Sequence, residues 1–281
     1  MKIKKNNLFL VSALLFIGVE VSSQIKQDSV RFAEISTEIL NKGKAYNELR
    51  DLTKNIGHRL SGSESYEKAV KWAEQKLRDA GADKVWLQEV MIPVWVRGKE
   101  SLQIKVSNGT WKNLKMLSLG NSEGTGGKDV TGEIIMVRSM EEYEKLTPDQ
   151  VKDKIVFFNY PFSQTYIETF RGYSDAAKYR STAASLTAKK GGKFAIIRSL
   201  SSAFDDVPHT GAMRYADDKK IPAVAIGSTT ADELALLLKS QKTVAKLNSN
   251  CGMKGEKLSH SVIGEITGKK RSKCDRSRWT S

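Results

Sequence analysis

The sequence predicts an α+β fold in which a compact, strand-rich segment is inserted into a second part of the chain. Helical periodicity dominates before about residue 82, and short strand patterns dominate from about residue 100 to residue 255. One further strand pattern follows near residue 260. Because the two flanking segments enclose a compact middle, the pattern suggests an inserted domain.

Three helices are expected in the first part. Apolar residues recur at helical spacing from Ser29 to Ile56, and Gly43 separates two helices within that stretch. A Gly- and Ser-rich loop, NIGHRLSGS, follows. Ser63 is then expected to cap a third helix, and Gly81 is expected to end it.

The strands are expected where β-branched and aromatic residues gather. DKVWLQEVMIPVWV predicts a long strand that is broken near Pro93, and a second strand follows it. GTWKNLKMLSL, TGEIIMVRS, DKIVFFNYP, GKFAIIRS, KIPAVAIG, KTVAKLNSN and HSVIGEI predict the others. Helices are expected over 174–190 and after the KIPAVAIG strand, where Thr229 or Thr230 is expected to act as the cap.

The net charge of +14 at first suggests a nucleic-acid partner. Much of the excess lies at the ends of the chain, above all in the basic tail at 269–281. The body has no stretch that interleaves basic and aromatic residues as a nucleic-acid-binding face would. We therefore expect no nucleic-acid partner.

Residues 1–24 have the layout of a signal peptide. Lysines come first, an apolar run from Leu8 to Val19 follows, and small and polar residues end the segment. The run is shorter than the roughly 20 apolar residues that span a bilayer, although an N-terminal membrane anchor is the alternative. We expect cleavage near residue 24, a secreted or periplasmic protein, and no stable membrane span.

The chain contains two cysteines, Cys251 and Cys274. Exported proteins keep disulfides, so a bridge between the two is an open alternative. Two cysteines this far apart do not form a zinc-binding motif.

Several segments resemble secreted zinc peptidases of the M28 class. IGHRLSGSESYEKAVKWAEQKLRDAGADKVWLQEV is similar to the opening of these enzymes, although His58 stands where a proline is expected. KIVFFNYPF, AAKYRSTAASLTAKKGGKFAIIRS, VPHTGAMRY and KKIPAVAIGSTTADELALLL resemble the protease-associated (PA) domain of the carboxypeptidase Q-like branch. HSVIGEITG resembles the strand that returns to the peptidase domain. The resemblance covers roughly residues 28–268.

The resemblance implies a fold and a domain order. It implies a PA-type β-sandwich or open barrel with flanking helices, inserted into an incomplete α/β peptidase domain. Residues 25–99 and 258–268 would belong to the peptidase domain, 100–257 to the PA domain, and 269–281 to an unrelated basic tail. In this family the first zinc ligands, a His-x-Asp pair, come soon after the return strand. We therefore expect the chain to be truncated before the metal site.

The histidines do not suggest a metal site in this chain. His58, His209 and His260 are the three that it contains, and none has the spacing of a metal-binding motif. We expect no catalytic residue, no metal ligand and no bound zinc here, whereas the intact family binds zinc and a peptide substrate. By the resemblance, PA-domain loops cover the active-site cleft, so His209 and Tyr215 would face substrate. The alternative is that PHTG is simply a turn.

Other polar residues are interpreted as surface groups. Glu141 and Glu142 are expected on a solvated face. Arg171, Arg180 and Arg198 are scattered, and no carboxylate partner can be inferred for them from the sequence. Two functions remain. The chain is either the N-terminal and PA-domain portion of a secreted M28-class metallo-exopeptidase, inactive alone, or a stand-alone PA-domain module that binds partners or forms a homodimer.

Overall fold

The computed structural model describes residues 27–216 and 219–268. These residues divide into two units, up to Arg59 and from Leu60 onward, and each unit is described by itself. The predicted signal peptide and the basic tail with Cys274 lie outside the described residues. Within the described ranges, none of the helices combines the length and the apolar character that crossing a membrane requires.

The first unit is helical, as predicted. Residues 27–42 form one helix, Gly43 interrupts it, and α2 (Ala45–Asp51) continues directly into the π-helical turn η1 (Leu52–Ile56). Most of the apolar side chains that gave the helical periodicity are exposed, among them Phe32, Ile35 and Leu40. Their apolar face is therefore not covered by the described part of this unit.

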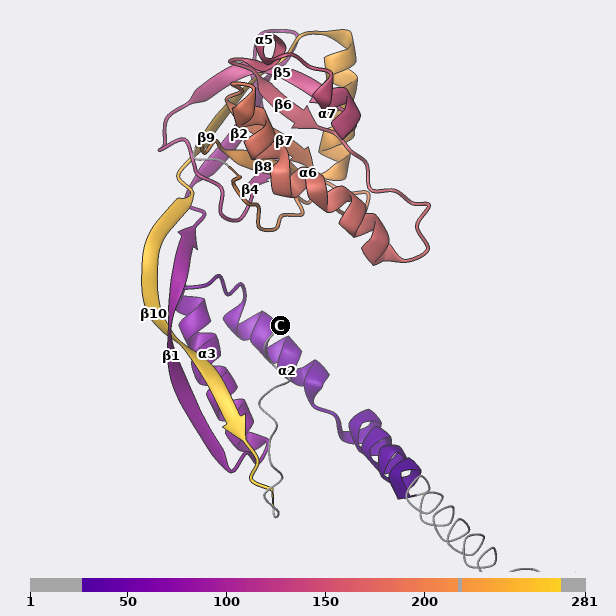
Figure 1. Ribbon diagram of the computed structural model, residues 1–281, viewed down its shortest axis with the longest axis vertical. Coiled ribbons are helices and arrows are strands. Elements are labelled where there is room, and N and C mark those ends of the chain that lie inside the picture. Colours follow the sequence, from indigo (N-terminus) through magenta and orange to yellow (C-terminus); the bar gives the residue numbers. More distant parts are fainter. Residues whose placement is uncertain (1–26, 217–218, 269–281) are drawn as a thin grey trace, which may run out of the picture. The chain divides into compact units, whose positions relative to one another are not determined.

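A helix and a two-stranded ribbon open and close the second unit (Figure 1). Helix α3 (Glu64–Asp79) begins at the predicted cap, where the Ser63 hydroxyl accepts a hydrogen bond from the Tyr66 amide at 3.1 Å. It ends before Gly81, whose φ of 87° favours glycine. Helix α3 packs along the ribbon formed by β1 (Lys84–Val96) and β10 (Gly252–Glu265).

The ribbon joins residues that are far apart in the sequence. Its antiparallel pairing runs from Lys84 opposite Glu265 to Val96 opposite Gly252. The predicted break near Pro93 is a shift of register between Pro93 and Trp95, and the strand continues beyond it.

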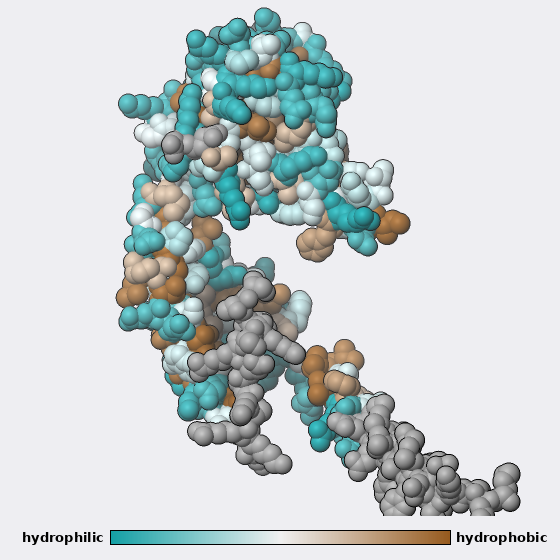
Figure 2. Space-filling model, viewed as in Figure 1, coloured by the Kyte–Doolittle hydropathy of each residue, from teal (hydrophilic) through white to brown (hydrophobic). Residues whose placement is uncertain are grey.

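Apolar side chains remain exposed along this ribbon. Trp86, Val90 and Met91 of β1 and Leu258 of β10 are each more than a third exposed. Figure 2 shows apolar residues in brown over this part of the molecule. The ribbon therefore leaves apolar side chains open to solvent on its described surface.

The other eight strands form one mixed sheet in the order β3-β2-β9-β5-β6-β7-β8-β4. The strands β5, β6, β7 and β8 are parallel, and their neighbours on both sides are antiparallel. Strand β5 is shared between two halves of the sheet, because Val130–Glu133 pairs with β9 and Ile134–Val137 pairs with β6. The bounds are β2 (Glu100–Lys105), β3 (Trp111–Leu114), β4 (Met116–Ser118), β5 (Val130–Val137), β6 (Ile155–Phe158), β7 (Phe194–Arg198), β8 (Ala223–Ile226) and β9 (Val244–Ser249).

Helices cover both faces of this sheet. The short helices α4 (Met140–Glu144) and α5 (Pro148–Val151) follow β5, α6 (Thr169–Lys189) precedes β7, and α7 (Ser228–Ser240) follows β8. Alternate residues of the central strands point to opposite sides. Val156, Phe158 and Ile197 pack with α6, whereas Ile155, Phe157 and Ile196 pack in the core on the side of α7.

Three expectations about element boundaries were wrong. Helix α6 begins at Thr169 and so before residue 174. The segment GTWKNLKMLSL forms two strands, because β3 pairs with β2 and β4 pairs with β8. Helix α7 begins at Ser228 with Gly227 at its N-cap and no side-chain cap, so Thr229 and Thr230 lie inside its first turn. The Thr230 hydroxyl bonds to the Asp206 carboxylate.

Candidate functional site

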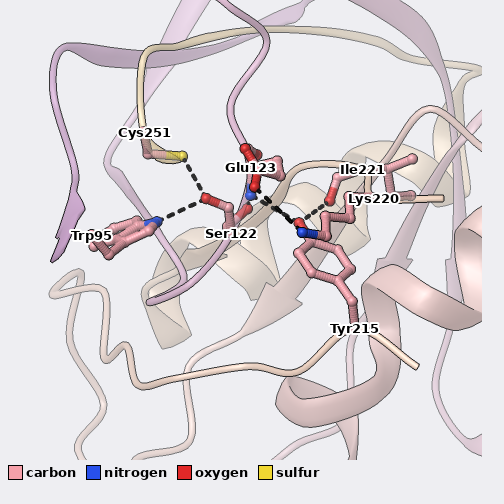
Figure 3. A network of polar contacts seen from close by, with 7 residues as sticks. All are labelled: Trp95, Ser122, Glu123, Tyr215, Lys220, Ile221 and Cys251. Carbon is pink, nitrogen blue, oxygen red and sulfur yellow. Dashed lines mark hydrogen bonds and ion pairs between the residues drawn. The ribbon is translucent and has the colours of Figure 1, made fainter. Parts of the chain in front are cut away.

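The ribbon meets the sheet at a buried polar junction (Figure 3). The indole nitrogen of Trp95 donates to the carbonyl oxygen of Ser122 at 2.8 Å, and the Cys251 thiol donates to the same oxygen at 3.3 Å. The Ser122 hydroxyl accepts from the Ala223 amide of β8 at 2.9 Å. Burial raises the pKa of the Cys251 thiol, which keeps it protonated and a donor.

Tyr215, one of the two residues expected to face substrate, lies beside this junction. Its hydroxyl donates to the Ile221 carbonyl oxygen at 2.7 Å and accepts from the Glu123 amide at 2.8 Å. Burial raises the pKa of Tyr215. The hydroxyl proton is therefore held by the backbone, and Tyr215 ties the segment around Ile221 to the loop around Glu123 (Figure 3).

We expect Tyr215→Phe to lower the free energy of unfolding by about 1–2 kcal/mol, because it leaves one buried carbonyl and one amide without their partner. Urea unfolding followed by circular dichroism measures the change. Tyr166→Phe is the matched control, since Tyr166 is 40% exposed and the same atom is removed in contact with solvent. Equal losses in both variants would contradict this assignment.

His209, the other residue expected to face substrate, lies in a different environment from Tyr215. Its backbone amide donates to the Ser199 hydroxyl at 2.7 Å, and its exposed ring meets the Tyr173 ring edge-on, with centroids 6.4 Å apart. It lines a small pocket of about 270 Å³ together with Tyr173, Phe162 and Leu200. The imidazole is thus accessible, whereas its amide is used to hold the loop.

A larger pocket of about 500 Å³ lies where the loop after His209 approaches the ribbon. Trp95 and Arg97 line it from the ribbon side, and Asn121, Thr210 and Gly211 line it from the sheet side. Its walls are mainly apolar with a few polar groups, which is the usual make-up of a pocket that binds a small molecule.

The described histidines do not fit a zinc pair. His58 lies in the first unit, His209 lies in a loop, and His260 lies on β10 opposite Glu89. Within 27–216 and 219–268, no three His, Cys, Asp or Glu residues are grouped so that they could hold a metal ion. A catalytic zinc needs three protein ligands that converge on it, so these residues do not supply its site. Glu141 and Glu142 are exposed on α4, as expected for a solvated face.

Sequence analysis missed one cluster of polar side chains. Arg198, at the end of β7, forms a bidentate ion pair with Asp232 of α7, with 3.1 Å between Nη2 and Oδ2. The same guanidinium donates to the Asn159 side-chain oxygen at 3.2 Å. Arg198 therefore has the carboxylate partner that could not be inferred from the sequence. The available signal was that Asn159 and Arg198 both stand at the carboxyl ends of buried strands.

Comparison with known proteins identifies the relatives of the chain. No family model matches it. Carboxypeptidase Q of Homo sapiens is 30% identical over 266 residues, which cover 90% of this chain and 53% of that protein. Carboxypeptidase Q of Bos taurus is 29% identical over 261 residues, which cover 88% of this chain and 52% of that protein. The chain thus spans about half the length of the curated relatives that it matches.

Solved structures agree with this relationship. A Peptidase M28 precursor from Shewanella amazonensis superposes with a TM-score of 0.78 and 30% identity, covering 87% of this chain and 55% of that one. A zinc aminopeptidase from Bacillus subtilis, at 18% identity and a TM-score of 0.51, covers 78% of this chain and 46% of its own, and shares the fold. The chain is therefore a homologue of the carboxypeptidase Q-like peptidases of the M28 class.

Proposed function

We propose that the chain is the N-terminal and PA-domain portion of a secreted M28-class metallo-exopeptidase, of carboxypeptidase or aminopeptidase type, that hydrolyses peptides or dipeptides. The observation that carries the proposal is the 30% identity to carboxypeptidase Q over nearly the whole chain, together with the TM-score of 0.78 to an M28 peptidase. The apolar run and small polar residues of 1–24 support export, with signal-peptide cleavage near residue 24.

The domain boundaries are part of this proposal. Residues 25–99 and 258–268 would belong to the peptidase domain, and 100–257 would be the inserted PA domain. The pairing of β1 with β10 supports the insertion, since an inserted domain returns the chain to the point where it departed. The sharing of β5 between two halves of the sheet supports a PA-type open barrel, which needs a strand that turns from one half to the other.

The loop 209–212 would face the substrate of the intact enzyme. His209 is exposed, and Thr210 and Gly211 line the pocket of about 500 Å³ next to the ribbon. Tyr215, the other residue proposed to face substrate, follows this loop in the sequence, and its hydroxyl is bonded to the backbone of Ile221 and Glu123. Zinc would be bound by residues outside those described, because the described donors do not fit a zinc pair.

We expect the purified chain to show no peptidase activity by itself, because none of its three histidines has the spacing of a metal-binding motif and the described residues contain no group of donors that could hold a metal ion. The measurement is hydrolysis of a panel of dipeptides in the presence of zinc, with and without a chelator. A full-length M28 relative assayed in parallel is the control. Turnover by the purified chain that the chelator abolishes would contradict the proposal.

The second candidate is a PA-domain module that binds peptides or pairs with itself. The observation that favours it is that the eight-stranded sheet has a buried core on each face, so this part has what an independently folding domain needs. Sedimentation velocity distinguishes the two. A dimer whose population rises with protein concentration supports self-association. If the dimer persists when the exposed ribbon residue Trp86 is changed to Ser, the contact lies in the sheet part and not on the ribbon.

A further inference from the structure

The carboxyl ends of three parallel strands meet at a third pocket, of about 440 Å³. Arg138 follows β5, Asn159 follows β6 and Arg198 ends β7, and all three line it. Helix α7 supplies the other wall through Asp232, Leu236 and Lys239. In open α/β sheets, ligands bind in the crevice at the carboxyl ends of the strands, so this edge is where a site is expected.

The pocket has a surplus of positive charge. Asp232 is already paired with Arg198 through both carboxylate oxygens. Among the described residues, neither the Arg138 guanidinium nor the Lys239 ammonium has an acidic partner, and both residues are exposed. An anion that enters this pocket therefore meets two cations that are not already neutralised.

A buried amide points to the kind of ligand. Asn159 is 7% exposed, and its side-chain oxygen accepts from Arg198 at 3.2 Å, which fixes the orientation of the amide. The amide nitrogen contacts the Met136 sulfur at 3.6 Å, and a thioether is a weak acceptor. Because this partner is weak, the amide nitrogen can still donate a stronger hydrogen bond to an oxygen that enters the pocket.

We infer that this pocket binds a carboxylate carried on a short apolar body, as at the end of a peptide or on an acidic side chain. Arg138 and Lys239 would hold the charge, the Asn159 amide would donate to one oxygen, and Leu236, which is 65% exposed, would contact the apolar body. Arg198 would stay paired with Asp232 and keep Asn159 in place. The inference does not depend on peptidase activity or on zinc.

The test is NMR titration of the purified full chain, following the Asn159 side-chain amide. The probes are acetyl-Ala-Leu with a free C-terminus, acetyl-Glu-Leu-amide, acetyl-Ala-Leu-amide and inorganic phosphate. Binding of either carboxylate peptide, at millimolar or lower concentration, supports the inference and identifies the source of the carboxylate. Equal binding of the uncharged amide peptide, or preference for phosphate, would overturn it.

Arg138 and Lys239 are both exposed, so substituting either one is not expected to disturb folding. Arg138→Gln and Lys239→Gln are each expected to weaken binding about tenfold, the loss of one charge-assisted hydrogen bond. Lys189→Gln, at the exposed end of α6, removes the same charge from a different helix and is expected to leave binding unchanged. A similar loss in all three variants would mean that net charge alone attracts the probe, and would overturn the assigned site.

Discussion

Phe157→Ala is expected to lower the free energy of unfolding by about 3–5 kcal/mol. Phe157 is fully buried in the middle of β6, paired with Met136 on one side and Ile196 on the other. Truncation removes a large apolar side chain and leaves a cavity that the sheet cannot close, because both neighbouring strands fix its width. Urea unfolding with circular dichroism and tryptophan fluorescence measures the loss.

The matched control is Phe204→Ala. Phe204 is 76% exposed in the loop between β7 and β8, so the same truncation removes little buried area. Its effect is expected to stay within about 0.5 kcal/mol. Equal effects of the two substitutions would mean that the core assigned to β6 is wrong.

Asp232→Asn is expected to lower the free energy of unfolding by about 1–3 kcal/mol. The Arg198 side chain is 10% exposed, so loss of its carboxylate partner leaves a largely buried cation with amide acceptors alone. The Asp232 side chain is 44% exposed, and solvent screening keeps the loss below that of a fully buried pair. Asparagine keeps the shape of the side chain, so the measured change reports the charge.

The next residue along the helix provides the control for that change. Glu233 pairs with Lys112 at 3.3 Å, and both side chains are more than half exposed. Glu233→Gln is therefore expected to cost less than about 0.5 kcal/mol. Equal stabilities of Asp232→Asn and Glu233→Gln in thermal and urea unfolding would mean that the ion pair between Asp232 and Arg198 stabilises the fold no more than an exposed pair does.

The sequence predicts elements better than it predicts their partners. Ser63 and Gly81 bound α3 as expected, because caps act through local hydrogen bonds and backbone angles. The predicted cap of α7 was wrong because the helix begins at Ser228, before both threonines, and the Thr230 hydroxyl bonds to Asp206, a partner that tertiary structure supplies. Likewise, the pairing that splits GTWKNLKMLSL into β3 and β4 depends on strands far away in the sequence.

In the candidate sites too, local sequence features could be predicted, whereas the tertiary partners of the side chains could not. That His58, His209 and His260 lack the spacing of a metal-binding motif is visible in the sequence itself. The partners of Arg198 could not, since Asn159 and Asp232 meet it only after three parallel strands and α7 are assembled. For Tyr215, the resemblance implied a place near substrate, whereas the structure adds the backbone groups that occupy its hydroxyl.

The pairing of β1 with β10 has a consequence for synthesis on the ribosome. Strand β1 emerges long before β10, so it must wait without its partner while the chain between them is translated. During that time Trp86 and Val90 are open to pairing with another nascent chain. Folding of the intervening sheet shortens this wait, because it brings the two ends together and lowers the entropy cost of closing the loop. Folding of the sheet between β1 and β10 therefore limits the time in which β1 can pair with another chain.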